Sequence, residues 1–256
     1  MKLIEVCEPF KVVQYKSSGY GGTVRQQELP FINVIVDELP KDMKAFVITS
    51  DLQGREDAPE NRLLGEAVAD ILVELQRDGT LPKLSFLASC GDLYDHPDFR
   101  KLGGTGDVTS VLNAFADNFE TVVAVHGNHD MVSEKLLPDN VHILDGTTVT
   151  IEGLSIGGVS GVMGKESRNQ RKSRESYFKH LKKAVNKRND LLLLHQAPKP
   201  DDDRKGDHEI ADFFKLNGSG LVAFGHVHWS DPVTIIGRNE FLNTDARVLI
   251  VTATPL

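Results

Sequence analysis

Five short apolar runs in this sequence each end at polar residues of the types that bind metal ions. The clearest is Val123–Val125, which is followed by Asn128, His129 and Asp130. Apolar runs of this length are typical of buried strands, and open α/β sheets carry their functional sites at the carboxyl ends of such strands. We therefore expect an α/β (α+β) protein whose functional groups lie along one edge of a sheet.

The same construction recurs at four other places in the chain. Residues 46–50 lead to Asp51 and Gln53, residues 84–88 to Asp92, residues 191–194 to His195, and residues 221–224 to His226 and His228. Any single histidine is more often a hydrogen-bonded structural residue than a metal ligand. However, strands that served only for packing would not all end in this way, and His226 and His228 would point to the same face of a strand. The ordered set favours a metal site.

These side chains form a mixed oxygen and nitrogen ligand set, which suits Mn, Fe, Zn or Ni and is poor for calcium or for a thiolate site. The ligands suffice for two metal ions, and one carboxylate would bridge them at a separation of about 3.5–4 Å, as in two-metal hydrolases. Such a pair makes hydroxide available near neutral pH and holds phosphate oxygens as charge develops. The set predicts a phosphoester hydrolase in which His129 is placed to protonate the leaving oxygen.

A length of 256 residues, 40% of them hydrophobic, suits one α/β domain that spans residues 1–256. Residues 1–45 resemble two strands joined by a glycine-containing loop, and they form either an N-terminal β extension of the main sheet or an oligomerisation arm. The oligomeric state is left open. No apolar run is long enough to cross a membrane and the start lacks a secretory signal, so we expect a soluble, cytoplasmic protein with no membrane partner.

A basic stretch from Lys165 to Arg188 has two interpretations. It is either a solvated helix face or an electrostatic collar for a nucleic acid or another polyanion, which would make binding salt-dependent. The formal net charge of −8 argues against generic polyanion binding, although a local patch can override a global sum. Separately, Arg55 could contact a substrate phosphate or simply lie on the surface.

The ordered blocks Asp51-x-Gln53, Gly91-Asp92, Gly127-Asn128-His129-Asp130, His195 and Gly225-His226-x-His228 resemble the calcineurin-like metallophosphoesterase superfamily. The resemblance spans residues 46–228 and implies two mixed β-sheets packed as a sandwich flanked by helices. It also implies two divalent metal ions bridged by Asp92. One site would be completed by Asp51, Gln53 and His228, and the other by Asn128, His195 and His226. The resemblance makes His129 the proton donor and Asp130 the residue that orients it.

The chain departs from the family pattern in two places. Gln53 stands where the family has histidine, and an amide would bind through its carbonyl oxygen, which favours Mn²⁺ or Mg²⁺ over Zn²⁺. We therefore expect two divalent ions, with Mn²⁺ preferred and Fe, Zn, Mg or Ni as alternatives. In addition, the second block continues into His96 and Pro97, whereas the Ser/Thr protein phosphatases of the superfamily carry Asp-Arg-Gly after it. A protein phosphatase of that type is not expected.

Our leading hypothesis is a metal-dependent phosphoesterase that acts on a phosphodiester or nucleotide-type substrate, because Gly-Asn-His-Asp is similar to the block of the diesterase-leaning branches. A phosphomonoesterase and a nuclease are the enzymatic alternatives. The alternative of another class is a non-catalytic scaffold that keeps the fold without the metals, and Gln53 is the residue that points to it.

Overall fold

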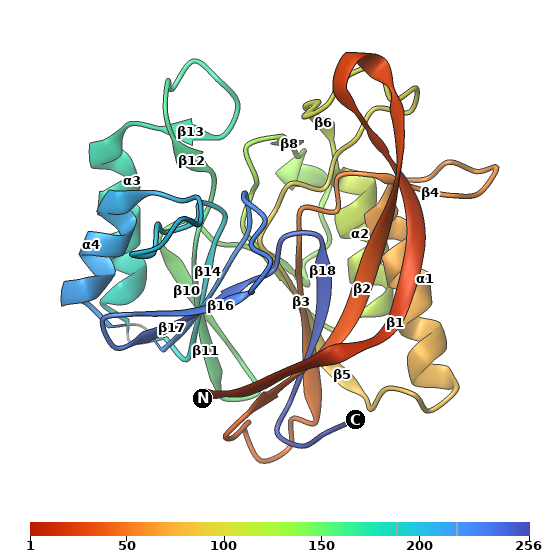
Figure 1. Cartoon of the computed structure of the whole chain (residues 1–256). Helices are drawn as coiled ribbons and strands as arrows, with labels where there is room; N and C mark the ends of the chain where they lie inside the picture. The colour runs from red at the N-terminus through yellow and green to blue at the C-terminus, as the bar shows by residue number, and fades with distance from the viewer. Residues whose placement is uncertain (188, 219) are drawn as a thin grey trace.

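The apolar runs form the central strands of two mixed β-sheets in the computed structural model, which describes residues 1–187, 189–218 and 220–256 (Figure 1). The larger sheet has the strand order β4 (Arg55–Glu56), β1 (Leu3–Ser18), β2 (Val24–Val36), β18 (Arg247–Thr252), β3 (Ala45–Ser50), β5 (Leu84–Ser89), β7 (Val122–Ala124) and β9 (Val141–Ile143). The smaller sheet has the order β10 (Thr147–Ile151), β11 (Leu154–Val159), β14 (Leu191–Leu194), β15 (Leu221–Phe224), β17 (Asn239–Asn243) and β16 (Val233–Ile236).

Both sheets contain a run of parallel strands. In the larger sheet β3, β5, β7 and β9 are parallel to one another, and in the smaller sheet β11, β14, β15 and β17 are parallel. Two short pairs, β6 (Gly106–Asp107) with β8 (Asp130–Met131) and β12 (Val162–Met163) with β13 (Arg171–Lys172), lie in the loops beyond the sheets. Because parallel strands end at one edge of their sheet, the polar residues that follow them are brought to the same end of the molecule.

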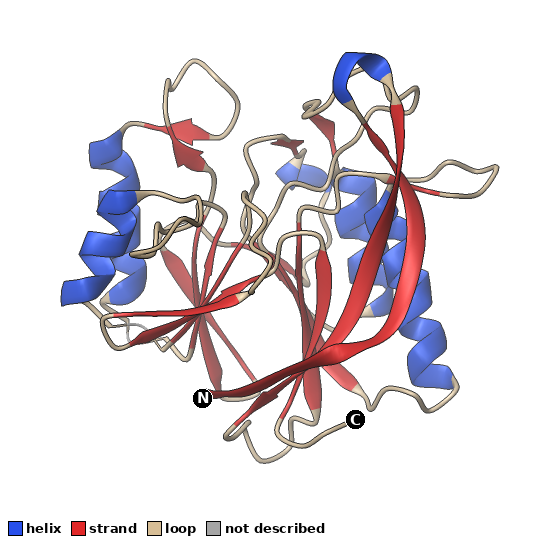
Figure 2. Ribbon diagram, in the orientation of Figure 1, coloured by secondary structure: helices blue, strands red, loops and turns tan. Residues whose placement is uncertain are grey.

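The two sheets pack face to face around an apolar core. Phe46 and Phe86 of the larger sheet stack with ring centroids 4.6 Å apart, and Leu193 and Leu242 of the smaller sheet belong to the same buried cluster. Helices cover the two outer faces (Figure 2). This arrangement confirms the predicted fold of two mixed sheets packed as a sandwich and flanked by helices.

Each helix buries one apolar face against its sheet. The larger sheet is covered by α1 (Leu64–Arg77) and α2 (Thr109–Asn118), and the smaller one by α3 (Arg174–Val185) and α4 (His208–Leu216). The Asp207 carboxylate caps α4 by accepting hydrogen bonds from two backbone N–H groups of its first turn, at 2.9 and 3.1 Å. Two short 3₁₀ helices, Tyr20–Gly22 and Glu134–Leu136, lie in loops. No helix within the described ranges is long and apolar enough to cross a membrane.

The N-terminal strands form a long antiparallel hairpin that belongs to the larger sheet. β2 pairs in parallel with β18, while β1 lies outside it, and the hairpin rises beyond the sheet (Figure 1). At its tip, the backbone N–H of Ser18 donates to Asp95 Oδ2 at 2.7 Å, and the Ser18 hydroxyl donates to the same carboxylate. The two strands predicted within residues 1–45 therefore belong to the larger sheet.

Candidate metal centre

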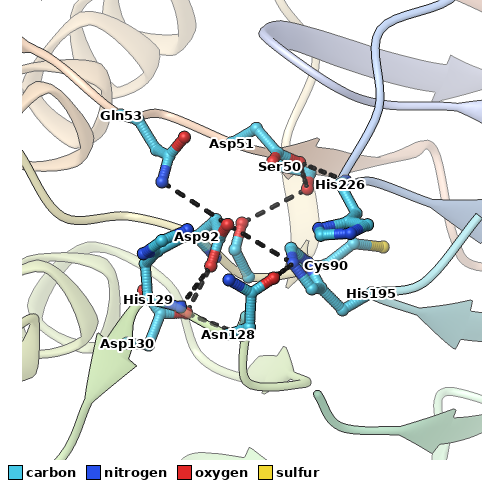
Figure 3. A network of polar contacts seen from close by, with 12 residues as sticks. Ser50, Asp51, Gln53, Cys90, Asp92, Asn128, His129, Asp130, His195 and His226 are labelled. Carbon is cyan, nitrogen blue, oxygen red and sulfur yellow. Dashed lines mark hydrogen bonds and ion pairs between the residues drawn. The ribbon is translucent and has the colours of Figure 1, made fainter. Parts of the chain in front are cut away.

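Five strand ends converge on one polar cluster between the two sheets (Figure 3). Asp51 follows β3, Asp92 follows β5 and Asn128 follows β7, all in the larger sheet, whereas His195 follows β14 and His226 follows β15 in the smaller sheet. One ligand atom from each of Asp92, His195 and His226 lies within 4.8 Å of the other two. The sequence blocks thus meet in space as the strand pattern predicts.

The backbone at three of these strand ends is in the left-handed region. Asp51, Asp92 and His226 have φ angles of 52°, 57° and 71°. Residues other than glycine rarely adopt this conformation, which carries a strain of order 1–3 kcal/mol per residue and concentrates at functional sites. The conformation turns the chain sharply after each strand, at the point where the cluster begins.

Two glycines allow the strand-end turns to approach one another closely. A Cβ on Gly127 would lie 2.1 Å from the backbone nitrogen of Asp92, and a Cβ on Gly225 would lie 2.2 Å from Asp51 Oδ2. No side chain can be accommodated at such distances without movement of the neighbouring groups. The glycines that precede Asn128 and His226 in the sequence are therefore required by packing within the cluster.

Asp130 connects two of the turns. Its carboxylate accepts hydrogen bonds from the backbone N–H groups of Asp92, Leu93 and Gly127, each at 2.8 Å. The imidazole of His129 instead lies beside Thr105, whose Oγ1 is 3.3 Å from Nδ1. Among these contacts it is Thr105, rather than Asp130, that could orient the His129 ring, while Asp130 fixes the backbone around the cluster.

His195 is fully buried and held from both sides of its ring. Nδ1 donates to the carbonyl oxygen of Cys90 at 2.8 Å, while Nε2 lies 3.3 Å from Asn128 Oδ1 and 3.4 Å from Asp92 Oδ2. Burial alone would lower the pKa of His195, but the Asp92 carboxylate outweighs it and raises the pKa to about 10. For Asp92 the two effects have the opposite signs: burial raises its pKa, and the charge of His195 lowers it. The effect of His195 is the larger, so the pKa of Asp92 lies below its usual value.

The side chain of Asp51 is hydrogen-bonded to the backbone of His226. Asp51 Oδ2 accepts a hydrogen bond from the His226 backbone N–H at 3.0 Å and another from the Ser50 hydroxyl. Burial, reinforced by the nearby Asp245, raises the pKa of Asp51 well above its usual range. Burial, with the charge of His195 as the next cause, lowers the pKa of His226 to about 4. The crowded carboxylates thus raise the pKa of both Asp51 and His195, and a bound cation in place of these protons would relieve the same repulsion.

The structure places the other two predicted ligands at the margin of the cluster. Gln53 is half-buried and its Nε2 donates to Asp92 Oδ2 at 3.4 Å, so a rotation of the amide would present its oxygen instead. The side chain of His228 is 55% exposed and lies outside the three converging residues, with Nδ1 3.2 Å from Asp245 Oδ1. Metal binding by Gln53 and His228, as by the other predicted ligands, is a prediction.

Asp245 was not indicated by any motif in the sequence. This residue lies in the turn between β17 and β18 and forms a β-bridge with Ser50, next to Asp51. An aspartate in a turn is ordinary by itself. Its position depends on the pairing of β18 with β3, which brings together segments from near the two ends of the chain, and no local pattern reports such a pairing.

Several of the predicted basic residues have partners elsewhere in the fold. Arg55 donates to the carbonyl oxygens of Asp95 and Asn61, so its guanidinium supports a loop. Lys172 donates to the Ser160 carbonyl oxygen at 2.7 Å, and Arg174 pairs with Glu209. Arg188, the end of the predicted basic stretch, lies outside the described residues.

Arg171 is different from these residues. It is half-buried, and its side chain has no hydrogen bond or ion pair within the described part of the chain. After burial and the charge of His195, the charge of Arg171 is a further cause of the low pKa of His226. This places a free guanidinium close to the metal-ligand cluster.

Comparison with known proteins agrees with this architecture. Residues 44–230 match the model of the calcineurin-like phosphoesterase family. None of the curated proteins with which the chain was compared matches it. The structure is similar to the crystal structure of TT1561 of Thermus thermophilus, with a TM-score of 0.55 and 16% identity over 80% of this chain and 90% of that one. At this identity the likeness shows the fold alone.

A second similar structure is that of the phosphopantetheinyl hydrolase PptH from Mycobacterium tuberculosis. Its TM-score is 0.46 and its identity 14%, over 78% of this chain and 88% of that one.

Proposed function

This chain belongs to the calcineurin-like phosphoesterase family, and we propose that it is a metal-dependent hydrolase of phosphate esters, with a phosphodiester or nucleotide-type substrate favoured. The observation that carries the proposal is the convergence of Asp92, His195 and His226 within 4.8 Å at the ends of three strands. A packing role alone gives no reason to bury a carboxylate and two imidazoles together at strained strand ends.

The donor set fits divalent metal ions. The Cys90 carbonyl oxygen holds His195 Nδ1, which leaves Nε2 to face the Asp92 carboxylate and the Asn128 amide oxygen. We propose that Asp92 is shared between two ions, that Asn128, His195 and His226 complete one site, and that Asp51, Gln53 and His228 complete the other. Divalent ions held there would supply Lewis acidity, which stabilises charge on the phosphoryl oxygens and makes hydroxide available near neutral pH.

The other residues of the site would bind and protonate the substrate. The Thr105 hydroxyl lies beside Nδ1 of His129, which leaves Nε2 to carry the proton that the leaving oxygen takes up. Arg171 would bind a phosphoryl oxygen, because its guanidinium has no partner within the described residues. Asp130 would act indirectly, since its three hydrogen bonds to backbone hold Asp92 and the turn before Asn128 in place.

The proposed preference for Mn²⁺ rests on Gln53. An amide oxygen is a harder ligand than an imidazole, so this site should favour Mn²⁺ or Mg²⁺ over Zn²⁺. Within the basic stretch Lys172 and Arg174 are engaged with Ser160 and Glu209, whereas Lys179, Lys182 and Lys183 are exposed and have no ion pair among the described residues, so a nucleic-acid substrate stays an alternative to a small phosphodiester.

The test of this proposal is hydrolysis by metal-stripped protein to which Mn²⁺, Mg²⁺, Zn²⁺ or Ni²⁺ is returned. The substrates are bis(4-nitrophenyl) phosphate and 4-nitrophenyl phosphate, a matched diester and monoester. We expect Mn²⁺ to restore the highest rate and the diester to be the preferred substrate. Asp92→Ala should lower the metal content of the protein, and it should lower the rate of hydrolysis by at least about 100-fold. Gln53→His should shift the preference toward Zn²⁺.

The outcomes separate the alternatives. A protein that binds none of these ions and cleaves neither ester would be a non-catalytic scaffold. Activity that appears only in Gln53→His would mean that this amide has switched the site off. If the monoester dominates, the chain is a phosphomonoesterase.

A further inference from the structure

A groove of about 770 Å³ lies between the N-terminal hairpin and the turn that joins β17 to β18. We call it the hairpin groove. Its hairpin wall includes Gln14, Tyr15, Gln27 and Glu28, and its opposite wall includes His228 and Asp245. The hairpin lies outside residues 44–230, the part of the chain that matches the family.

The strand register places this groove beside the metal centre. β18 begins at Arg247, which lies opposite Ser50 on β3, and on its other side Val248 lies opposite Phe31 on β2. The residues of β2 that precede Phe31 therefore extend beyond the start of β18 and the end of β3, which Asp51 follows. Asp245, in the opposite wall, bridges to Ser50 directly before Asp51. A molecule bound at the metal centre through its phosphate could extend from there into the groove.

The hairpin changes character where the smaller sheet no longer covers it. On one face of β2, Ile32, Val34 and Val36 are buried between the two sheets. Because side chains alternate along a strand, the same face continues toward the tip as Pro30, Glu28 and Gln26. The side chains thus change from aliphatic to polar at the point where the face opens into the groove.

The groove offers hydrogen bonds but few free positive charges. By the same alternation Tyr15 and Gln27 lie on the opposite face, with the buried Leu29 and Phe31, so the polar side chains of the groove face include Gln14 and Glu28. Gln14 donates to the exposed Glu28 carboxylate at 2.9 Å. Arg247 is the guanidinium at the groove, and it donates to Asn243 Oδ1 and to the carbonyl oxygens of Asp245 and Trp229, so its N–H groups serve the fold.

The charges of the walls select against an anion. A second phosphate in the groove would meet the carboxylates of Glu28 and Asp245, while the guanidinium there is already engaged, which is unfavourable. Hydroxyl groups, in contrast, can donate to these carboxylates and to the amide oxygen of Gln14. Among the described residues that line the groove, no exposed aromatic ring is positioned to stack on a base, since Tyr15 is buried.

We propose that the hairpin groove binds the alcohol portion of the substrate, and that this portion is an uncharged polyol such as a glycerol or sugar group. The inference rests on the proposed phosphoesterase function and specifies its substrate class. It assigns the N-terminal hairpin the role of a specificity element.

The test compares three 4-nitrophenyl phosphodiesters whose second alcohol is methanol, glycerol or glycerol that carries a further phosphate. The methyl ester is too small to fill the groove and reports the metal centre alone. We expect kcat/KM to be highest for the glyceryl ester and to fall when the additional phosphate is present. Gln14→Ala and Glu28→Ala should each lower the glyceryl-to-methyl ratio of kcat/KM by about threefold to tenfold, the value of one hydrogen bond.

Two further variants complete the design. Glu28→Lys should raise kcat/KM for the phosphorylated ester, because it replaces a repulsive charge by an attractive one. Lys11→Ala is the matched control on the same hairpin, since Lys11 is outside the groove lining and its charge acts on Asp78. It should leave the ratio as in the unmodified protein.

The inference is overturned if the glyceryl ester is no better than the methyl ester, if the groove variants lower both to the same extent, or if the phosphorylated ester is preferred. Failure of the underlying function looks different: no ester is then hydrolysed with any metal, and the groove inference falls with it.

Discussion

At the scale of single residues, Arg171 differs from Lys172 and Arg174 of the same basic stretch in the partners of its charge. Lys172 lies next to it in the sequence and is bound to Ser160 and Asp145, and Arg174 is bound to Glu209 and lies over an aromatic ring. Among these three residues, Arg171 alone has no such partner in the described part of the chain, and it lies near His226. A half-buried guanidinium without a counter-ion is unfavourable unless a ligand provides one.

We expect Arg171→Ala to lower kcat/KM for the preferred phosphodiester by about 10–100-fold, because a hydrogen bond to a charged group contributes about 1.5–3 kcal/mol. Steady-state kinetics of Arg171→Ala and of the control Arg174→Ala, both loaded with the same metal, check this. The control removes a cation that is engaged with Glu209 and should change kcat/KM by less than about twofold. Equal losses in both variants would mean that the effect is one of overall charge and not of position.

The residues that could be predicted from the sequence are those whose role is visible in a local motif. Asp92, His195 and His226 each follow an apolar run, and the structure brings them together. Asp245 and Tyr15 could not be predicted, because nothing in their neighbouring residues distinguishes them from ordinary turn and strand residues. Their proximity to Asp51 arises because β1 pairs with β2, β2 with β18, and β18 with β3, at the end of which Asp51 lies.

At the scale of elements, the strand ends act as a unit because their turns interlock. A methyl group at position 127 would occupy the space of the Asp92 backbone nitrogen. We expect Gly127→Ala to lower the free energy of unfolding by about 1–3 kcal/mol, as overpacking does, and to lower metal affinity as well, because Asp92 must move. Chemical denaturation and metal titration of the purified variant measure the two effects.

Gly218→Ala is the matched control for that substitution. A Cβ there would first meet Arg238 Nε, at 3.3 Å, which belongs to a flexible side chain. We expect its free energy of unfolding to change by less than about 0.5 kcal/mol. If Gly127→Ala behaved like Gly218→Ala, the close contact between the two turns would not be required for the site.

The central strands could be predicted from local sequence, whereas the full extent of the N-terminal hairpin could not. Apolar runs indicated the central strands, because burial on both faces demands continuous apolar sequence. β1 extends over Leu3–Ser18, although few of its residues are buried. Its stability comes from pairing with β2 along its whole length, which leaves no alternating apolar pattern in β1 to detect.

At the scale of the whole molecule, the fold presents two different surfaces to a substrate at the strand ends. Figure 1 shows β13, which carries Arg171, and the N-terminal hairpin on opposite sides of this edge. A phosphodiester has one charged centre and two alcohol groups, so Arg171 on one side and the hairpin groove on the other match the chemistry of the proposed substrate. The global charge of −8 is consistent with a site that attracts one phosphate through metal ions and local cations and repels polyanions elsewhere.

The hairpin also couples the stability of the whole molecule to pH through Tyr15. Its side chain packs in the core beneath the helices and is 6% exposed. Burial, together with the charges of Asp245, Asp95 and Asp51, raises the pKa of Tyr15 from 10 to about 12. The neutral phenol is therefore favoured in the folded state, and its contribution is fully present below pH 10 and is lost as the pH rises through about 12.

We expect the free energy of unfolding to fall between pH 10 and pH 12, with Tyr15 responsible for up to about 2.7 kcal/mol of the decrease, since one pKa unit corresponds to about 1.36 kcal/mol. In Tyr15→Phe this part of the decrease should vanish, because no proton can be lost from the ring. Denaturant unfolding at several alkaline pH values measures it, and Tyr20→Phe, at a tyrosine that is 80% exposed, is the control. Suppose that both variants lost stability with pH as steeply as the unmodified protein. Tyr15 would then ionise freely in the folded state, and its side chain would not be packed in the core.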